Sequence, residues 1–199
     1  MKMLNKLPQN IKINNKRYFI NTDFRVMINF EKTLQGINMI EEQEISIKMY
    51  KVLKSFCPVF FETFHKNMKK DMKLLLKQFL WFYSCGGRED YHSGNGKGRA
   101  INDIYSYEYD DEYIWSAFFQ CFNIDLTEEK LHWWKYKAIF QSLPEECKFE
   151  RIKSYRAYNG KDKDKKELKK YWKLPLDKEL QKQLDKTKKY LMKVSEEVK

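Results

Sequence analysis

Residues 107–156 read YEYDDEYIWSAFFQCFNIDLTEEKLHWWKYKAIFQSLPEECKFERIKSYR, and they carry the densest helix-capping and aromatic signals in the chain. Three helices are predicted within it. The first helix follows Asp110 or Asp111, because either carboxylate can accept hydrogen bonds from the free backbone N–H groups at a helix start. This helix is expected to end near Phe122, where the sequence Asn-Ile-Asp turns the chain.

The second and third helices are predicted from capping residues. Thr127 is a good N-cap, and the two glutamates after it place negative charge at the positive end of a helix dipole. That helix is expected to continue to about Gln141. Ser142 has capping-box spacing to Glu145, with a proline where a helix start tolerates one, so the third helix is predicted to begin there.

Apolar side chains surround most of the second helix, which therefore lies in a core or presents one face to a partner. Adjacent residues on a helix point about 100° apart, so one stripe cannot easily hold two neighbouring tryptophans. We predict that Leu131, Trp134 and Ala138 form the buried stripe. The neighbouring face must meet another helix or another protein, and its residues are the candidate partner-binding site: Trp133, Tyr136, Lys137 and Phe140.

The N-terminal part, residues 1–87, is predicted to hold a hairpin followed by helices. Ile11 and Ile13 alternate with polar residues, and Asn14-Asn15 can adopt the positive φ angles of a tight turn. Apolar residues at helical spacing then predict one helix from about residue 24 to Gly36, one that stops before Pro58, and one from about residue 68 to residues 86–87.

Residues 88–102 are predicted to be a mobile linker loop, since they are rich in glycine and nearly free of apolar side chains. A glycine-lysine pair there resembles part of a phosphate-binding loop. However, Tyr91 stands where that motif needs glycine, and Gly98 replaces the serine or threonine that would bind magnesium. Nucleotide binding is therefore not expected.

Residues 159–199 are predicted to form a basic helical extension that is loosely attached to the rest of the chain. Residues 160–199 hold fourteen lysines against eight acids, so they carry +6 of the net charge of +11. Leucines at helical spacing predict an amphipathic helix after Pro175. Mixed lysines and acids of this kind usually form a solvated helix face.

The blocks YSYEYDDEYIWSAF, NIDL, LHWWKYKAIFQSL and KFERIKSYR, with LPQNIKINNKRYFINTDFRVMINFE near the start, resemble the bacteriophage gp-fifteen family. The family occurs in tailed phages and prophages of Gram-positive bacteria, and it usually has Asn-Gly where this chain has Asn14-Asn15. The resemblance implies a tail-morphogenesis protein, namely a tail assembly chaperone that binds the tape measure or tail tube protein. It supplies no catalytic residues.

Catalytic, cofactor and metal sites are not expected from the sequence. The three histidines, His65, His92 and His132, lack the paired spacing of zinc ligands. No nucleophile has a base at a recognisable spacing, although spatial neighbours cannot be read from a sequence. An acidic cluster at residues 108–112 could bind a cation, but its simpler role is to cap a helix. We therefore predict that the protein is not an enzyme.

Composition favours a protein that stays in a reducing cytoplasm, and the resemblance implies that this is the cytoplasm of a bacterial host. The four cysteines are far apart and show no pairing pattern, and no signal peptide or membrane span is visible. The sequence pI near 9.3 permits nucleic-acid binding. Because the basic residues are mostly lysines interleaved with acids, only weak and nonspecific binding is expected.

These observations predict a mainly α protein: a helical domain with a small N-terminal β-hairpin, onto which an aromatic block at residues 103–158 packs as one domain, and a basic C-terminal helical extension. The predicted function is a non-catalytic tail assembly factor that binds another tail protein through an aromatic surface. Two alternatives are a nucleic-acid-binding protein driven by the lysine-rich tail and a structural virion component. Self-association is a further open alternative.

Overall fold

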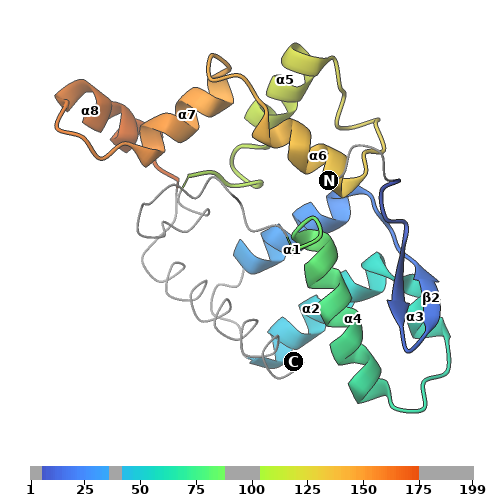
Figure 1. Ribbon diagram of the computed structural model, residues 1–199. Helices are drawn as coiled ribbons and strands as arrows, with labels where there is room; N and C mark the ends of the chain where they lie inside the picture. The colour runs from blue at the N-terminus through green and yellow to red at the C-terminus, as the bar shows by residue number, and fades with distance from the viewer. Residues whose placement is uncertain (1–5, 36–41, 88–103, 175–199) are drawn as a thin grey trace. The chain divides into compact units, whose positions relative to one another are not determined.

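The computed structural model describes residues 6–35, 42–87 and 104–174. These residues are mainly helical and include one antiparallel two-stranded sheet, which confirms the predicted fold class (Figure 1). The predicted linker at 88–102, the helix predicted after Pro175, His92 and Gly36 lie outside the described residues. The chain forms two compact units, and each is described by itself. Unit 1 comprises described residues 6–87 and 132–134, and unit 2 comprises 104–131 and 135–174.

Unit 1 begins with the predicted hairpin. Strands β1 (Asn10–Ile13) and β2 (Lys16–Phe19) pair antiparallel. Asn14 and Asn15 form the turn with φ angles of 47° and 65°. Asparagine tolerates this left-handed region, so the hairpin closes without a glycine. The alternating residues Ile11, Ile13 and Tyr18 are buried, and the strand residues between them are exposed.

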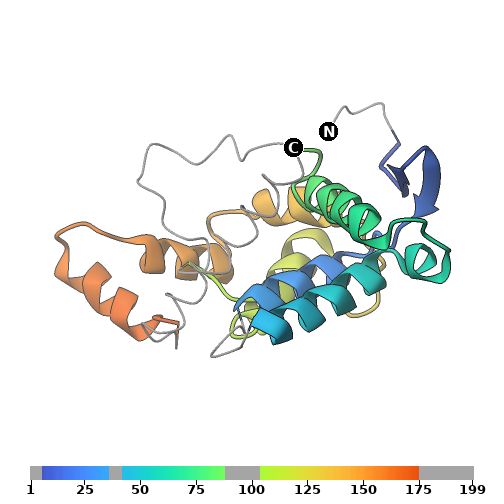
Figure 2. The ribbon, with the colours of Figure 1, turned by 90° about the horizontal axis from the view of Figure 1, so that it is seen from below.

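Four helices complete the described part of unit 1: α1 (Phe24–Gln35), α2 (Glu42–Phe56), α3 (Pro58–Glu62) and α4 (Met68–Tyr83). The Asp23 carboxylate accepts a hydrogen bond from the Arg25 N–H at 2.9 Å, and this bond caps the start of α1. Helices α1 and α2 lie side by side, with α4 beside α2 (Figure 2). Edge-to-face contacts of Phe79 with Phe30 and Phe56 join these three helices.

Unit 2 is built from α5 (Asp111–Phe122), α6 (Trp133–Gln141), α7 (Lys148–Ala157) and α8 (Lys163–Tyr171), although the first two residues of α6 belong to unit 1. Its core is aromatic. Phe118 of α5 stacks on Tyr136 of α6 with ring centroids 5.1 Å apart. Phe140 of α6 in turn contacts Phe149 of α7 at 5.5 Å. Helix α5 has the bounds that the sequence predicted.

The predicted starts of α6 and α7 are wrong. Thr127 lies in a turn, where its backbone N–H and its hydroxyl both donate to the Asp125 carboxylate, at 2.8 and 2.6 Å. Its hydroxyl is therefore used as a donor and does not cap a helix. The Ser142 hydroxyl lies 3.0 Å from the carbonyl oxygens of Ala138 and Ile139, so it closes α6 and does not open α7.

The segment predicted to be loosely attached begins within unit 2. Helix α8 is exposed along most of its length, but Leu174 after it is buried. The Trp172 ring contacts the Tyr113 ring edge-to-face, with centroids 5.9 Å apart. The backbone carbonyl of Trp172 accepts a hydrogen bond from Arg156 at 2.6 Å. The prediction of loose attachment is therefore wrong for residues 172–174.

Candidate protein-interaction surface

The candidate site predicted on α6 is mostly buried. Trp133, Tyr136 and Phe140 are 1%, 0% and 7% exposed, and Lys137 is half-buried. The predicted buried stripe is wrong, because Ala138 is exposed whereas Leu131 and Trp134 are half-buried. Helical spacing did identify two neighbouring faces. The buried face is the one that carries the three large aromatic rings of Trp133, Tyr136 and Phe140.

Both tryptophans at the start of α6 have a polar partner in unit 1. The Trp133 indole N–H donates to the Tyr83 carbonyl at 2.8 Å, and that of Trp134 donates to the Phe82 carbonyl at 2.8 Å. These carbonyls belong to the last turn of α4, and the Phe82 carbonyl also accepts the Cys85 N–H at 3.1 Å. Two neighbouring tryptophans that point in different directions can thus both pack and form hydrogen bonds within one unit. The sequence analysis placed the two rings on different faces but could not show that both would find partners in unit 1.

The Trp134 ring also explains a glycine. Gly86 has a φ angle of +92°, and a Cβ atom placed on it would lie 3.3 Å from the tip of the Trp134 ring. A residue with a side chain would be strained there and would crowd the indole. Of the two glycines predicted to end α4, Gly86 therefore also makes room for the Trp134 ring, whereas Gly87 has open space around it.

An exposed aromatic surface lies instead on α5. Trp115, Phe119 and Phe122 are spaced by four and three residues, so they share one side of the helix. We call these three residues the α5 aromatic face. Their exposed fractions are 37%, 44% and 37%. Large apolar side chains gathered on one exposed helix face are typical of a protein-interaction surface.

The α5 aromatic face is held in a fixed geometry. The Trp115 and Phe119 rings stack at 5.2 Å with their planes 8° apart. The Trp115 indole N–H donates to the Asp125 carboxylate at 3.0 Å, which ties the turn after α5 to this face. Hydrogen bonds from the Thr127 side chain, then from Trp115, and from the Thr127 backbone lower the pKa of Asp125. The carboxylate is therefore ionised at neutral pH.

The start of α5 is fixed by a buried ion pair. Arg156 from α7 makes two hydrogen bonds to the Asp110 carboxylate, at 2.6 and 2.9 Å. The same guanidinium donates to the carbonyls of Ile104 and Trp172. The Asp110 carboxylate also accepts the Ser106 N–H. Of the two residues proposed for the start of α5, Asp110 makes no side-chain cap hydrogen bond, whereas the Asp111 carboxylate accepts the Glu112 N–H at 2.9 Å.

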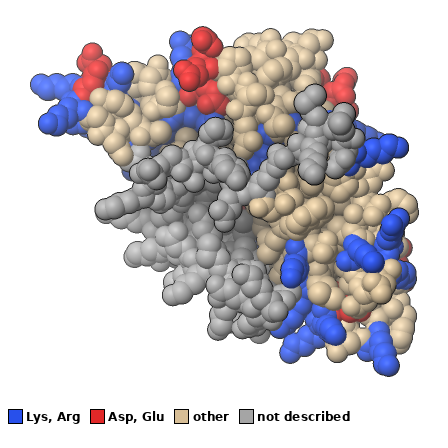
Figure 3. Space-filling view, in the orientation of Figure 1, with Lys and Arg blue, Asp and Glu red and all other residues tan. Residues whose placement is uncertain are grey.

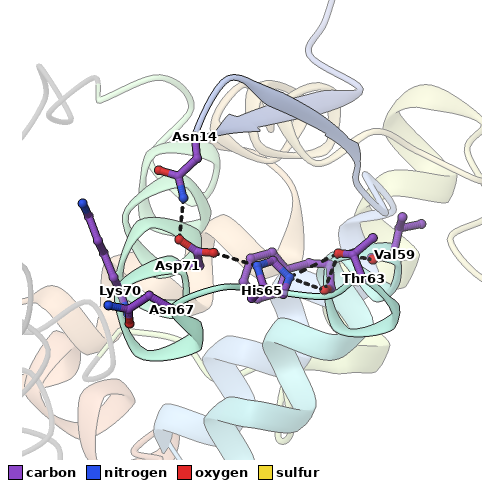
Figure 4. Close-up of polar contacts among 8 residues, drawn as sticks. Asn14, Val59, Thr63, His65, Asn67, Lys70 and Asp71 are labelled. Carbon is purple, nitrogen blue, oxygen red and sulfur yellow. Dashed lines mark hydrogen bonds and ion pairs between the residues drawn. The ribbon is translucent and has the colours of Figure 1, made fainter.

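A second polar cluster that the sequence did not reveal lies in unit 1 (Figure 4). His65 Nδ1 is 2.8 Å from the Asp71 carboxylate, and Thr63 Oγ1 is 3.2 Å from His65 Nε2. Asn14 in the hairpin turn donates to the other Asp71 oxygen. This hydroxyl–imidazole–carboxylate order is also found in hydrolases.

The hydrogen bonds of this cluster fit a structural role. His65 Nε2 lies 2.8 Å from the Phe60 carbonyl oxygen, which can only accept. That nitrogen must therefore carry a hydrogen, and it has no lone pair with which to deprotonate Thr63. The Thr63 hydroxyl has an acceptor of its own in the Phe60 carbonyl at 2.9 Å. The cluster joins the hairpin turn, the segment after α3 and the first turn of α4.

Metal-site and membrane searches cover the described residues only. Within them, His, Cys, Asp and Glu side chains do not gather in any group of three or more that could hold a metal ion. No helix in the same part of the chain has the length and apolar character needed to cross a membrane.

The described residues define a class: a mainly helical protein with an N-terminal hairpin and an exposed aromatic face on one helix. The chain belongs to the Bacteriophage Gp15 protein family, whose model matches residues 3–195. This match confirms the resemblance seen in the sequence, and the family indicates a phage structural or assembly protein. Searches of curated proteins and of solved structures gave no match.

Proposed function

We propose that this protein is a non-catalytic phage tail assembly factor that binds the tape measure or the tail tube protein through the α5 aromatic face. The observation that carries the proposal is the exposed, stacked pair of Trp115 and Phe119 in a phage protein. It replaces the earlier candidate face on α6, whose aromatic rings are buried.

The face has the properties of an interface anchor. An aromatic side chain buries roughly 150–250 Å² when it is fully covered, so three partly exposed rings offer a substantial apolar contact. The stacking and the indole hydrogen bond to Asp125 fix the rings before a partner arrives. Less conformational entropy is then lost on binding, which favours affinity.

A tape measure protein is a suitable partner on physical grounds. It is a long helical chain whose apolar stripes need cover until the tail tube encloses them. One helix face can pack against such a stripe by ridges-into-grooves contact. Many copies, each bound with moderate affinity, would cover the stripe and still be displaced by the tube.

The test is co-expression of this protein with the tape measure and, separately, with the tail tube protein of the same phage. Phe119→Ala removes an exposed ring that has no hydrogen bond to lose, so the fold should remain. Phe64→Ala is the matched control, because that ring is 94% exposed and lies in unit 1. We expect one tail protein to co-purify with wild type and Phe64→Ala but not with Phe119→Ala. If the tail protein still co-purifies with Phe119→Ala as well as with Phe64→Ala, the α5 aromatic face is not the binding surface.

Nucleic-acid binding is the rival function, favoured by the exposed lysines of α8. Such lysines give nonspecific affinities of roughly 10⁻⁴–10⁻⁶ M at physiological salt. We expect titrations with duplex and single-stranded oligonucleotides to stay in that range. Submicromolar binding to either would contradict the assembly factor as the sole function. Mass spectrometry of mature virions would test the other rival, a structural tail component.

A further inference from the structure

We infer that the partner segment received by the α5 aromatic face is a helix whose apolar stripe is flanked by lysine or arginine residues. The inference rests on the proposed function, because it describes the partner of the same face. The observation behind it is the charge around α5. Residues 104–129 contain seven acidic residues and no lysine or arginine, in a chain of net charge +11. One of the seven, Asp110, is buried and paired with Arg156, and Lys148 of α7 lies over the Tyr113 ring of α5.

The acidic residues lie close to the aromatic rings. Glu112 is exposed and precedes Trp115 by three residues and Phe119 by seven, so it continues the same side of α5. At the other border, the hydrogen bond between Trp115 and Asp125 brings the turn after α5 beside the face. Glu128 in that turn is exposed. Negative charge therefore borders the rings from two elements.

This local charge differs from that of other surfaces of the protein. On the side shown in Figure 3, lysine and arginine atoms gather over the hairpin and α4 in unit 1 and over α8, whereas the surface over α5 is largely uncharged. The Asp125 carboxylate is ionised at neutral pH, and its hydrogen bonds lower its pKa below the ordinary value. A partner that carried glutamates beside its apolar stripe would meet like charges here.

The charges select the partner more than they hold it. An exposed ion pair contributes roughly 0.2–1 kcal/mol, which is less than the contribution of a buried aromatic anchor. Complementary charge instead fixes orientation and rejects the wrong partner. The Debye length is about 8 Å at physiological salt, so charges farther than this from the α5 aromatic face are largely screened there.

The test uses two synthetic peptides with the same leucine stripe at helical spacing. One peptide has lysines beside the stripe, and the other has glutamates. The overall charge of +11 would favour the glutamate peptide, whereas the α5 aromatic face should favour the lysine peptide. Fluorescence anisotropy at physiological salt gives the dissociation constant of each peptide for the full chain and its variants.

We expect Phe119→Ala to weaken binding of the lysine peptide by about tenfold, the effect of one interface aromatic of about 1.4 kcal/mol. Glu112→Gln/Glu128→Gln should weaken it by about threefold. Glu62→Gln/Glu167→Gln is the control variant, because it also removes two negative charges but from exposed positions on α3 and α8. It should leave binding of the lysine peptide unchanged. Binding of the glutamate peptide should be independent of Phe119.

The inference is overturned if wild type does not bind the lysine peptide, if Phe119→Ala leaves that binding unchanged, or if only the glutamate peptide depends on Phe119. Failure of the proposed function gives a different pattern. Phe119-dependent binding of the lysine peptide without co-purification of either tail protein removes the function and keeps the inference. If co-purification depends on Phe119 but the lysine peptide is not preferred, the proposed function stands and the inference about the partner's charge is overturned.

Discussion

Trp133 lies flat against Tyr83, with ring centroids 5.7 Å apart and planes 12° apart, and it donates its indole hydrogen bond to the Tyr83 carbonyl at 2.8 Å. One residue at the end of α4 thus supplies both the packing surface and the polar partner of a buried tryptophan. A buried indole N–H needs such a partner, and the sequence alone does not show it.

The two tryptophans should differ in their effect on stability. Trp133→Ala should lower the free energy of unfolding by about 3–5 kcal/mol, because it removes a ring that is 1% exposed. Trp134→Phe should cost about 1 kcal/mol, since it loses the hydrogen bond to Phe82 but keeps an aromatic ring. Urea unfolding followed by circular dichroism measures both. A Trp133→Ala variant as stable as wild type would contradict the packing described here.

The Asp110–Arg156 pair should be sensitive to the loss of either partner. Asp110→Asn or Arg156→Lys should destabilise the protein by roughly 3–5 kcal/mol, because each leaves a buried charge without its two-point contact. Glu150→Gln is the control, since its pair with Lys153 is only partly buried and should contribute under about 1 kcal/mol. Thermal melts of the three variants measure these losses of stability. If Glu150→Gln destabilises the protein as much as the other two variants, the buried Asp110–Arg156 pair contributes no more than a partly buried one.

Cys57 should be the slowest cysteine to react with thiol reagents. It is fully buried, and burial raises the pKa of its thiol, so little thiolate is present at neutral pH. Cys85 is half-buried in the same unit and is the internal comparison. Variants that retain one cysteine each can be followed during alkylation. Equal rates for Cys57 and Cys85 in the folded protein would mean that the region around Cys57 opens readily.

Asp125 should give a stability contribution that depends on pH. Its pKa is lower in the folded protein, so the contribution is present above the ordinary carboxyl pKa and is lost as the pH falls through the folded value. Comparison of wild type with Asp125→Asn across the acid range measures it. The two should differ at neutral pH and converge in acid. A constant difference would show that the hydrogen bonds do not depend on the charge.

Much of the fold could be predicted from local patterns. The Asn14-Asn15 turn, the apolar stripes of unit 1 and the bounds of α5 agree with the structure. These features depend on backbone conformation and on periodicity, which a sequence shows directly.

The starts of α6 and α7 could not be predicted, because Thr127 and Ser142 serve as donors to nearby acceptors. A capping residue has the same appearance in a sequence whichever role it takes.

The exposed surface was harder to predict for another reason. The spacing of Trp115, Phe119 and Phe122 marks a helix face, but α5 has aromatic residues on its buried side as well. Periodicity identifies faces and does not say which one another element covers. On α6 the same ambiguity led to the wrong choice between Trp133 and Trp134. The structure shows that Trp133 is the buried ring, because it contacts Tyr83, which lies fifty residues away in the sequence.

The Asp110–Arg156 pair also constrains how the sequence can change over time. Because one guanidinium serves a carboxylate and two carbonyls, mutation of either residue alone leaves the other buried without its partner. Divergence at these two positions must then proceed through a joint replacement. Across the family, positions 110 and 156 should therefore keep the acid–arginine combination together or lose it together, and an alignment of relatives would show them as a covarying pair.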